Sequence, residues 1–210
     1  METFKADRLV TINVDVQNDF CPGGTLAVTE GDQVVTPLNE LNAFTRQQGG
    51  TVVFTGDQHP VTTPHFDIWP QHCIAGTEGA ALREDLTVLS TDVIVDKGMG
   101  QTDGYSAFEG ITKDGRELAE LITPINRERV AVVMGGLATD YCVLNSALDA
   151  VKVNAGAGEI RTFVIREAIR GVNIQADDSD KALETMAQAG VIIVDTVADI
   201  TEGNLINVAA

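Results

Sequence analysis

The sequence is poor in cysteine, in positive charge and in long apolar runs. Its three cysteines, Cys21, Cys73 and Cys142, are odd in number and widely spaced, so we expect free thiols in a reducing compartment rather than a disulfide framework. Only 14 Lys and Arg stand against 31 Asp and Glu, and the net charge of −17 argues against nucleic acid as a partner, because its phosphates would be repelled. No apolar run approaches the roughly 18 residues needed to span a bilayer. The first residues also show no cleavage signature, so we expect no membrane partner and a cytoplasmic location.

The apolar content, 44% of 210 residues, is enough for a buried core, and the length fits one domain over residues 1–210. Short β-rich runs alternate with amphipathic stretches, which predicts an α/β fold with a parallel sheet between helices. We expect strands at 9–16, 51–55, 92–96, 129–134, 161–165 and 191–194. We expect helices within 32–48, 115–122 and 139–151, and one that has Ser179 as its N-cap and ends at Gly190.

Reactive side chains follow four of these strands. Asp15, Asp57, Lys97 and the segment 135–142 each lie at or just past the carboxyl end of a strand. In open α/β sheets, ligands bind at this edge. The sequence therefore predicts a single site to which four strands contribute.

Cys142 follows a buried strand, two glycines and a polar turn, so we expect it in the first turn of a helix. Unpaired backbone N–H groups and the helix dipole favour the thiolate there. The alternative is an inert core cysteine, which is the commoner case. Asp15 lies among apolar residues and needs a cationic partner, for which Lys97 is the candidate. The pair would form either a plain salt bridge or, with Cys142, a catalytic set in which Asp15 takes the thiol proton.

All three histidines fall within 14 positions of the long irregular segment 56–86. A loop of this length in a compact domain is usually functional. Asp57 with His59, His65 and His72 offers the donors that a first-row divalent ion such as Zn, Fe or Mn prefers. Cys73 adjoins His72 and could add a ligand. The alternative is a set of loop histidines that form surface hydrogen bonds.

Aromatic residues are scarce, with 7 Phe, 2 Tyr and 1 Trp, yet four of them lie in loops near the reactive residues. These are Phe20, Trp69, Tyr105 and Phe108. Loop aromatics beside polar groups suit a flat aromatic ligand. The alternative is that they fill core under the loops, which we favour for Phe108.

Taken together, these motifs resemble those of the nicotinamidase/pyrazinamidase enzymes, within the isochorismatase-like cysteine hydrolases. The first block is VDVQNDFCPGGTLAV at 14–28, and the nucleophile block is GGLATDYC at 135–142. A metal block lies at 56–60 with 69–77, and a lysine block at 96–98 with 105–109. Each block alone is weakly specific, but together they are highly specific and span nearly the whole chain.

The resemblance implies a three-layer α/β/α fold with a six-stranded, mostly parallel sheet. It implies a thioester mechanism that converts nicotinamide, and also pyrazinamide, to nicotinate and ammonia in NAD salvage. It further implies a cis Leu137–Ala138 peptide and one divalent ion, Zn above all, with Fe or Mn as alternatives. A homo-oligomer is compatible with the sequence, which does not fix the oligomeric state.

The residue roles that the resemblance implies fall into four groups. The catalytic residues are Asp15, Lys97 and Cys142. The metal ligands are Asp57, His59, His65 and His72. The substrate-binding residues are Phe20, Trp69, Tyr105 and Leu137. The oxyanion hole consists of the backbone N–H groups of Ala138 and Cys142.

Three competing functions remain to be weighed. Isochorismatases act on a vinyl ether and need no cysteine, so Cys142 speaks against them. Metal-free amidases should lack the set of Asp57, His59 and His65. A non-catalytic sensor on the same fold would be expected to lose Asp15, Lys97 or Cys142, and all three are present.

Overall fold

The computed structural model describes residues 3–100, 102–202 and 205–208. Its main sheet has the strand order β5-β4-β3-β2-β6-β7-β8, and all neighbours are parallel except β4 and β5. The bounds are β2 (Arg8–Val14), β3 (Thr51–Asp57), β4 (Val93–Lys97), β5 (Ile111–Thr112), β6 (Arg129–Leu137), β7 (Glu159–Arg170) and β8 (Ile192–Val194). The predicted count of six strands was wrong by one, because the two residues of β5 are too few to show a periodic pattern.

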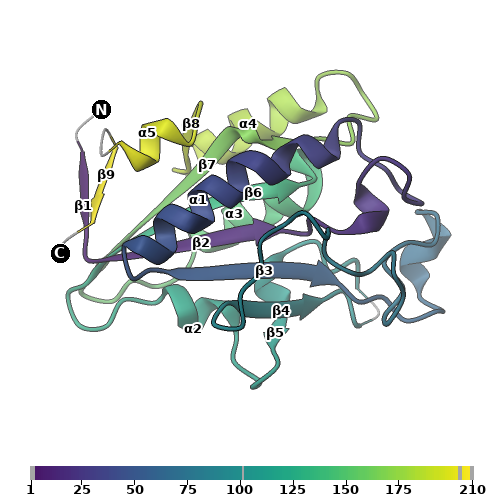
Figure 1. Cartoon of the computed structure of the whole chain (residues 1–210), viewed down its shortest axis with the longest axis horizontal. Helices are drawn as coiled ribbons and strands as arrows, with labels where there is room; N and C mark the ends of the chain where they lie inside the picture. The colour runs from purple at the N-terminus through teal and green to yellow at the C-terminus, as the bar shows by residue number, and fades with distance from the viewer. Residues whose placement is uncertain (1–2, 101, 203–204, 209–210) are drawn as a thin grey trace.

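Helices cover both faces of this sheet, so the three-layer α/β/α architecture is confirmed (Figure 1). On one face, α1 (Val35–Gln47) and α5 (Ala198–Thr201) pack on an apolar cluster that includes Leu38 and Ile200. The other face carries α2 (Leu118–Ile122), α3 (Leu144–Ala150) and α4 (Asp178–Gln188). Both faces of the central strands are therefore buried, as expected for a parallel sheet.

The ends of the described chain meet in a second, two-stranded sheet that the sequence did not suggest. Its strands, β1 (Phe4–Ala6) and β9 (Ile206–Val208), pair in parallel, and Figure 1 shows them side by side at one end of the molecule. None of the helices in the described ranges is both long and apolar enough to cross a membrane.

The boundaries of two helices show where local sequence signals succeed and fail. The first helix ends as predicted, since Gly49 adopts a left-handed φ of 69° and its N–H bonds back to Arg46 O. The predicted N-cap at Ser179 was wrong, because α4 begins one residue earlier, at Asp178, with Asp177 before it. The Asn173 side chain accepts a hydrogen bond from the Ser179 N–H, which meets the need of the first helical turn from outside the helix.

Strand β6 runs three residues beyond its predicted end and includes both glycines. Gly135 and Gly136 pair with Asn13 and Val14 of β2. A Cβ added at Gly136 would lie 2.0 Å from Val14 O, and its φ is 126°. The glycines therefore let β6 stay close to its neighbours up to the point where the chain turns into the nucleophile block.

Candidate active and metal site

Asp15, Lys97 and Cys142 come together at the carboxyl edge of the main sheet. Asp15 directly follows β2, Lys97 ends β4, and Cys142 lies beyond β6. Lys97 Nζ lies 2.8 Å from Asp15 Oδ2 and 3.6 Å from Cys142 Sγ. It also donates to Asp57 Oδ1 at 2.6 Å and to Gly104 O at 2.9 Å. The ammonium group thus joins the candidate nucleophile to two carboxylates.

Asp15 is placed to accept a proton from the thiol. The residue is fully buried, and its Oδ1 accepts a hydrogen bond from Thr55 Oγ1 at 2.6 Å. Oδ2 touches only the lysine charge and accepts no well-aligned hydrogen bond from the residues that the structure describes. An Asp15 oxygen and Cys142 Sγ lie within 4.8 Å of each other. A buried carboxylate next to a thiol is suited to act as a base.

Burial sets the protonation of the nucleophile. It raises the pKa of the Cys142 thiol well above its usual value, and the carboxylates of Asp15 and Asp57 add to this, while Lys97 opposes it. The expectation that the helix start would favour the thiolate is therefore wrong for the resting site. Burial also raises the pKa of Asp15 against the lowering effect of Lys97. Burial lowers the pKa of Lys97, but the two carboxylates more than offset this and hold it well above its usual value. The 2.8 Å contact pairs the Lys97 ammonium with Asp15, and the raised pKa of Cys142 favours its neutral thiol.

Cys142 lies in a single π-helical turn, Thr139–Val143, that leads into α3. Such turns are often found at functional sites. The Leu137–Ala138 peptide before this turn is cis, as the resemblance implied. The role of the Ala138 and Cys142 N–H groups as an oxyanion hole stays a prediction.

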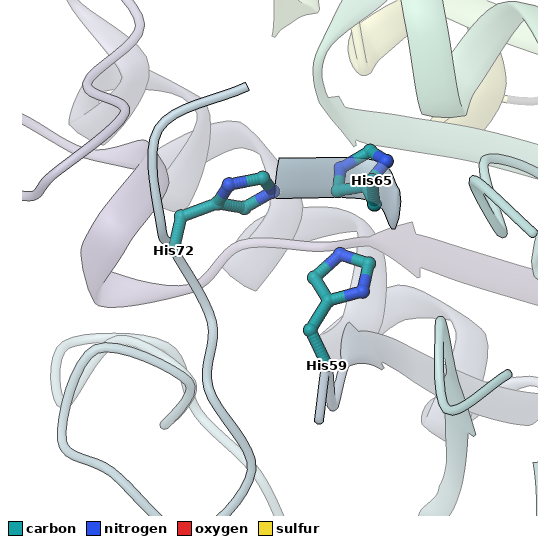
Figure 2. A group of neighbouring side chains, drawn as sticks. All are labelled: His59, His65 and His72. Carbon is teal, nitrogen blue, oxygen red and sulfur yellow. The ribbon is translucent and has the colours of Figure 1, made fainter. Parts of the chain in front are cut away.

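The three histidines converge beside this group, and Figure 2 shows their rings turned toward one another. The ring centroids of His59 and His65 are 4.5 Å apart. The ring centroid of His72 lies 5.1 Å from that of His59 and 5.2 Å from that of His65. All three residues are buried. The alternative of loop histidines with surface hydrogen bonds is thereby wrong.

Each histidine uses its Nδ1 for a hydrogen bond that leaves Nε2 for a ligand. The acceptors are Gly98 O for His59, Pro70 O for His72 and Asp103 Oδ1 for His65. His59 Nε2 is buried and has no hydrogen-bond partner within the described ranges. Burial also lowers the pKa of His72, which favours the neutral form that binds metals.

Asp57 connects the histidines to the catalytic candidates. Its Oδ2 lies 3.7 Å from His59 Nε2, while its Oδ1 accepts the bond from Lys97. Burial raises the pKa of Asp57, but Lys97 and His59 outweigh it, so the net shift is downward and the residue is a carboxylate. Three imidazoles and one carboxylate fit a divalent first-row ion by their chemistry. Cys73 is also buried, but its Sγ points to Gly79 O at 3.9 Å.

A cavity opens over Cys142, with aromatic rings around it. Phe20 packs on His72 with ring centroids 5.3 Å apart, and Trp69 Nε1 donates to the Tyr105 hydroxyl at 2.9 Å. The cavity is lined by Phe20, Leu26, Asp57, His65, Trp69, His72, Tyr105, Ala138, Tyr141, Cys142 and Val172. A concave, mainly apolar site with a few polar groups suits a small, flat ligand.

Two sequence predictions about this cavity need correction or confirmation. Leu137 was predicted to bind substrate, but its side chain is fully buried in the core, where a Cβ added at Gly31 would lie 3.3 Å from its Cδ1. It is not among the described residues that line the cavity. Phe108 packs against the core, as favoured.

The sequence reasoning missed Tyr141 and Val172. The ring of Tyr141 lies 5.1 Å from that of Trp69 and 5.5 Å from that of Tyr105. Its position next to Cys142 was a signal that could have identified it. Val172 follows β7 and is held at the cavity because its N–H donates to Asp140 Oδ1 at 2.9 Å. No local pattern in the sequence indicates that contact.

A thiol, a carboxylate and a lysine at the sheet edge, beside an aromatic cavity, are the features of an α/β cysteine hydrolase. Known proteins agree: the isochorismatase domain family matches residues 10–198. Because this match covers most of the sequence, the chain belongs to the isochorismatase family.

Three similar proteins are named nicotinamidase, pyrazinamidase or both. The nicotinamidase of Escherichia coli (strain K12) is 34% identical, over 89% of this chain and 93% of its own length. The nicotinamidase/pyrazinamidase of Mycobacterium tuberculosis is 35% identical, over 87% of this chain and 96% of its own. The crystal structure of the pyrazinamidase of Pyrococcus horikoshii in complex with zinc superimposes with a TM-score of 0.76 at 33% identity, covering 90% of this chain and 99% of that one.

Proposed function

We propose that this protein is a nicotinamidase that hydrolyses nicotinamide, and also pyrazinamide, to nicotinate and ammonia in NAD salvage. The observation that carries the proposal is the buried contact of Lys97 with both Cys142 and Asp15, beside a cavity lined by aromatic rings. The relatives that match over nearly the full chain are nicotinamidases and pyrazinamidases.

The chemistry follows from the resting thiol. Asp15 takes the proton of Cys142, and the sulfur attacks the carboxamide carbon to give a tetrahedral intermediate. The N–H groups of Ala138 and Cys142 hold the oxyanion, a type of contact whose loss typically costs about 10²–10³ in rate. The C–N bond breaks, and the leaving nitrogen departs as ammonia with the proton from Asp15, which leaves a thioester on Cys142.

The second half of the reaction hydrolyses the thioester and restores the free Cys142 thiol. Water gives one proton to Asp15 and attacks the thioester carbon, the C–S bond breaks, and the sulfur regains that proton from Asp15. The product leaves as nicotinic acid, which loses its remaining proton to solvent to give nicotinate. Lys97 stays protonated throughout, since two carboxylates hold its pKa high. It keeps Asp15 charged and in place, which is why a buried carboxyl group can act as the base.

Asp57, His59, His65 and His72 are proposed to hold one divalent ion, zinc in the first place, with iron or manganese as alternatives. When bound, the ion supplies a Lewis-acidic contact for the ring nitrogen, directly or through water, and so helps to position the amide over Cys142. This role calls for orientation of the ring more than for activation of the amide.

Removal of the metal provides the first test. We expect the protein to release ammonia from nicotinamide, and we expect dialysis against a chelator to lower that rate by about 10²-fold, the scale of a misplaced substrate. Addition of Zn²⁺, Fe²⁺ or Mn²⁺ should restore it. An as-purified, metal-loaded protein that releases no ammonia would overturn the proposed function. A chelated protein with full activity would instead refute metal dependence alone.

Shortening Trp69 should weaken substrate binding. Trp69→Ala removes a ring that contacts Tyr141 and donates to Tyr105, so we expect KM for nicotinamide to rise by about 3- to 10-fold, since an aromatic contact contributes about 0.5–1.5 kcal/mol. Trp69→Phe keeps an aromatic ring but not the hydrogen bond, so its KM should fall between those of the wild type and Trp69→Ala. The measurement is steady-state kinetics, and an unchanged KM in Trp69→Ala would show that the ring does not contact substrate.

We also infer that residues 1–210 form one domain that acts in the cytoplasm. All three cysteines are free and buried, which suits a reducing compartment. A homo-oligomer remains part of the proposal and is testable by light scattering.

A further inference from the structure

One of the three histidines has an orienting partner unlike those of the others. His59 and His72 each use Nδ1 for a neutral backbone carbonyl, of Gly98 and Pro70. His65 instead bonds through Nδ1, at 2.9 Å, to the side-chain carboxylate of Asp103. This carboxylate comes from a different loop, 38 residues further along the chain.

The loop that carries Asp103 already contacts the site at two other points. The Gly98 carbonyl faces His59 Nδ1, and the Gly104 carbonyl accepts a hydrogen bond from Lys97 Nζ. The loop can close this tightly only because both residues are glycine. A Cβ added at Gly104 would lie 2.7 Å from Gly98 Cα, and one at Gly98 would lie 2.7 Å from His59 Cε1. The closure places Asp103 directly over His65.

We propose that Asp103 is a positioning residue of the metal site. The inference rests on the proposed metal-binding role of His65. By accepting the Nδ1–H bond, Asp103 fixes the tautomer of His65, so that the Nε2 lone pair faces the common centre of the three rings. His65 lies in a short 3-10 helix, Pro64–Asp67, and the hydrogen bond to Asp103 ties its ring to a second loop.

The exposure of the two side chains makes the proposal testable. The His65 side chain is 3% exposed, whereas that of Asp103 is 47% exposed. Truncation of Asp103 therefore leaves no buried void, and the variants should fold like the wild type. Any effect on the metal can then be separated from an effect on stability.

The experiment measures the affinity of the metal-free full chain for Zn²⁺ by competition with a chromophoric chelator. We expect Asp103→Ala to bind Zn²⁺ about 10- to 100-fold more weakly than the wild type, the range found for such supporting partners. Asp103→Asn keeps an oxygen acceptor and should stay within about threefold of the wild type. Asp114→Ala is the control, since it removes an equal charge from an exposed turn and should leave the Zn²⁺ affinity unchanged.

Two results would overturn the proposal: a wild-type affinity in Asp103→Ala, or an equal loss in Asp103→Asn and Asp103→Ala. The second would show that the charge acts through space rather than through the hydrogen bond. Ammonia release by the wild type, measured in parallel, keeps the two proposals apart. A wild type without amidase activity whose Asp103→Ala variant still loses Zn²⁺ would refute the proposed function and support the role of Asp103.

Discussion

Replacement of Cys142 by alanine is expected to reduce ammonia release from nicotinamide by about 10⁴-fold or more, the scale seen when a catalytic nucleophile is removed. The physical reason is that the Cys142 sulfur forms the only covalent bond to the substrate in the proposed mechanism. Asp15 and Lys97 have no other thiol within reach, since the Cys73 sulfur faces Gly79 O. Zn²⁺ binding should survive, because none of the proposed metal ligands is changed.

The matched control is Cys21→Ala. Cys21 is also buried, and burial raises the pKa of its thiol to about 11, but it contacts none of the catalytic candidates in the described structure. Its variant should therefore retain activity within about an order of magnitude, the loss being one of packing. Ammonia release and Zn²⁺ content are measured on both proteins. Near-native turnover by Cys142→Ala would end the assignment of the nucleophile.

Much of the site could be predicted because its residues lie in short segments at strand ends. Parallel strands bring their carboxyl ends to one edge, so Asp15, Lys97 and Cys142 could be brought together from strand positions alone. The crowding of the histidines within one loop likewise predicted their convergence. In both cases short sequence segments identify the reactive residues, and the topology of the parallel sheet brings them together.

What the sequence could not show depends on packing between distant segments. Val172 reaches the cavity only because the loop after β7 bonds to Asp140, and Asp103 reaches His65 only because Gly98 and Gly104 close the loop. The resemblance gives Leu137 a position in a motif but does not show that its side chain is buried away from the cavity lining. The thiol pKa was misjudged for a related reason, since the burial of Cys142 cannot be read from its place at a helix start.

Replacement of Lys97 by methionine is expected to destabilise the metal-free protein by about 3–5 kcal/mol, the usual cost of removing one partner from a buried ion pair. Methionine has a similar length and fills the space, so the loss comes from charge. Asp15 and Asp57 would be left as buried carboxylates within 4.8 Å of each other and without a cation. Lys181→Met is the control. It removes an exposed lysine from a surface pair with Asp177 and should leave the free energy of unfolding nearly unchanged.

The pH dependence of this loss identifies its cause. Without Lys97, burial raises the pKa of Asp15 further above its ordinary value of about 3.9. A carboxyl group whose folded pKa lies above its unfolded pKa binds its proton more tightly when folded, so it destabilises the protein as the pH rises above the unfolded value. Urea unfolding should therefore show a small deficit near pH 4 that grows toward pH 7. The same shift favours the protonated form of Asp15, which cannot accept the thiol proton, so Lys97→Met should also lose amidase activity. A deficit that is equal at both pH values would mean that Lys97 acts by packing, and its proposed role in keeping Asp15 charged would fail.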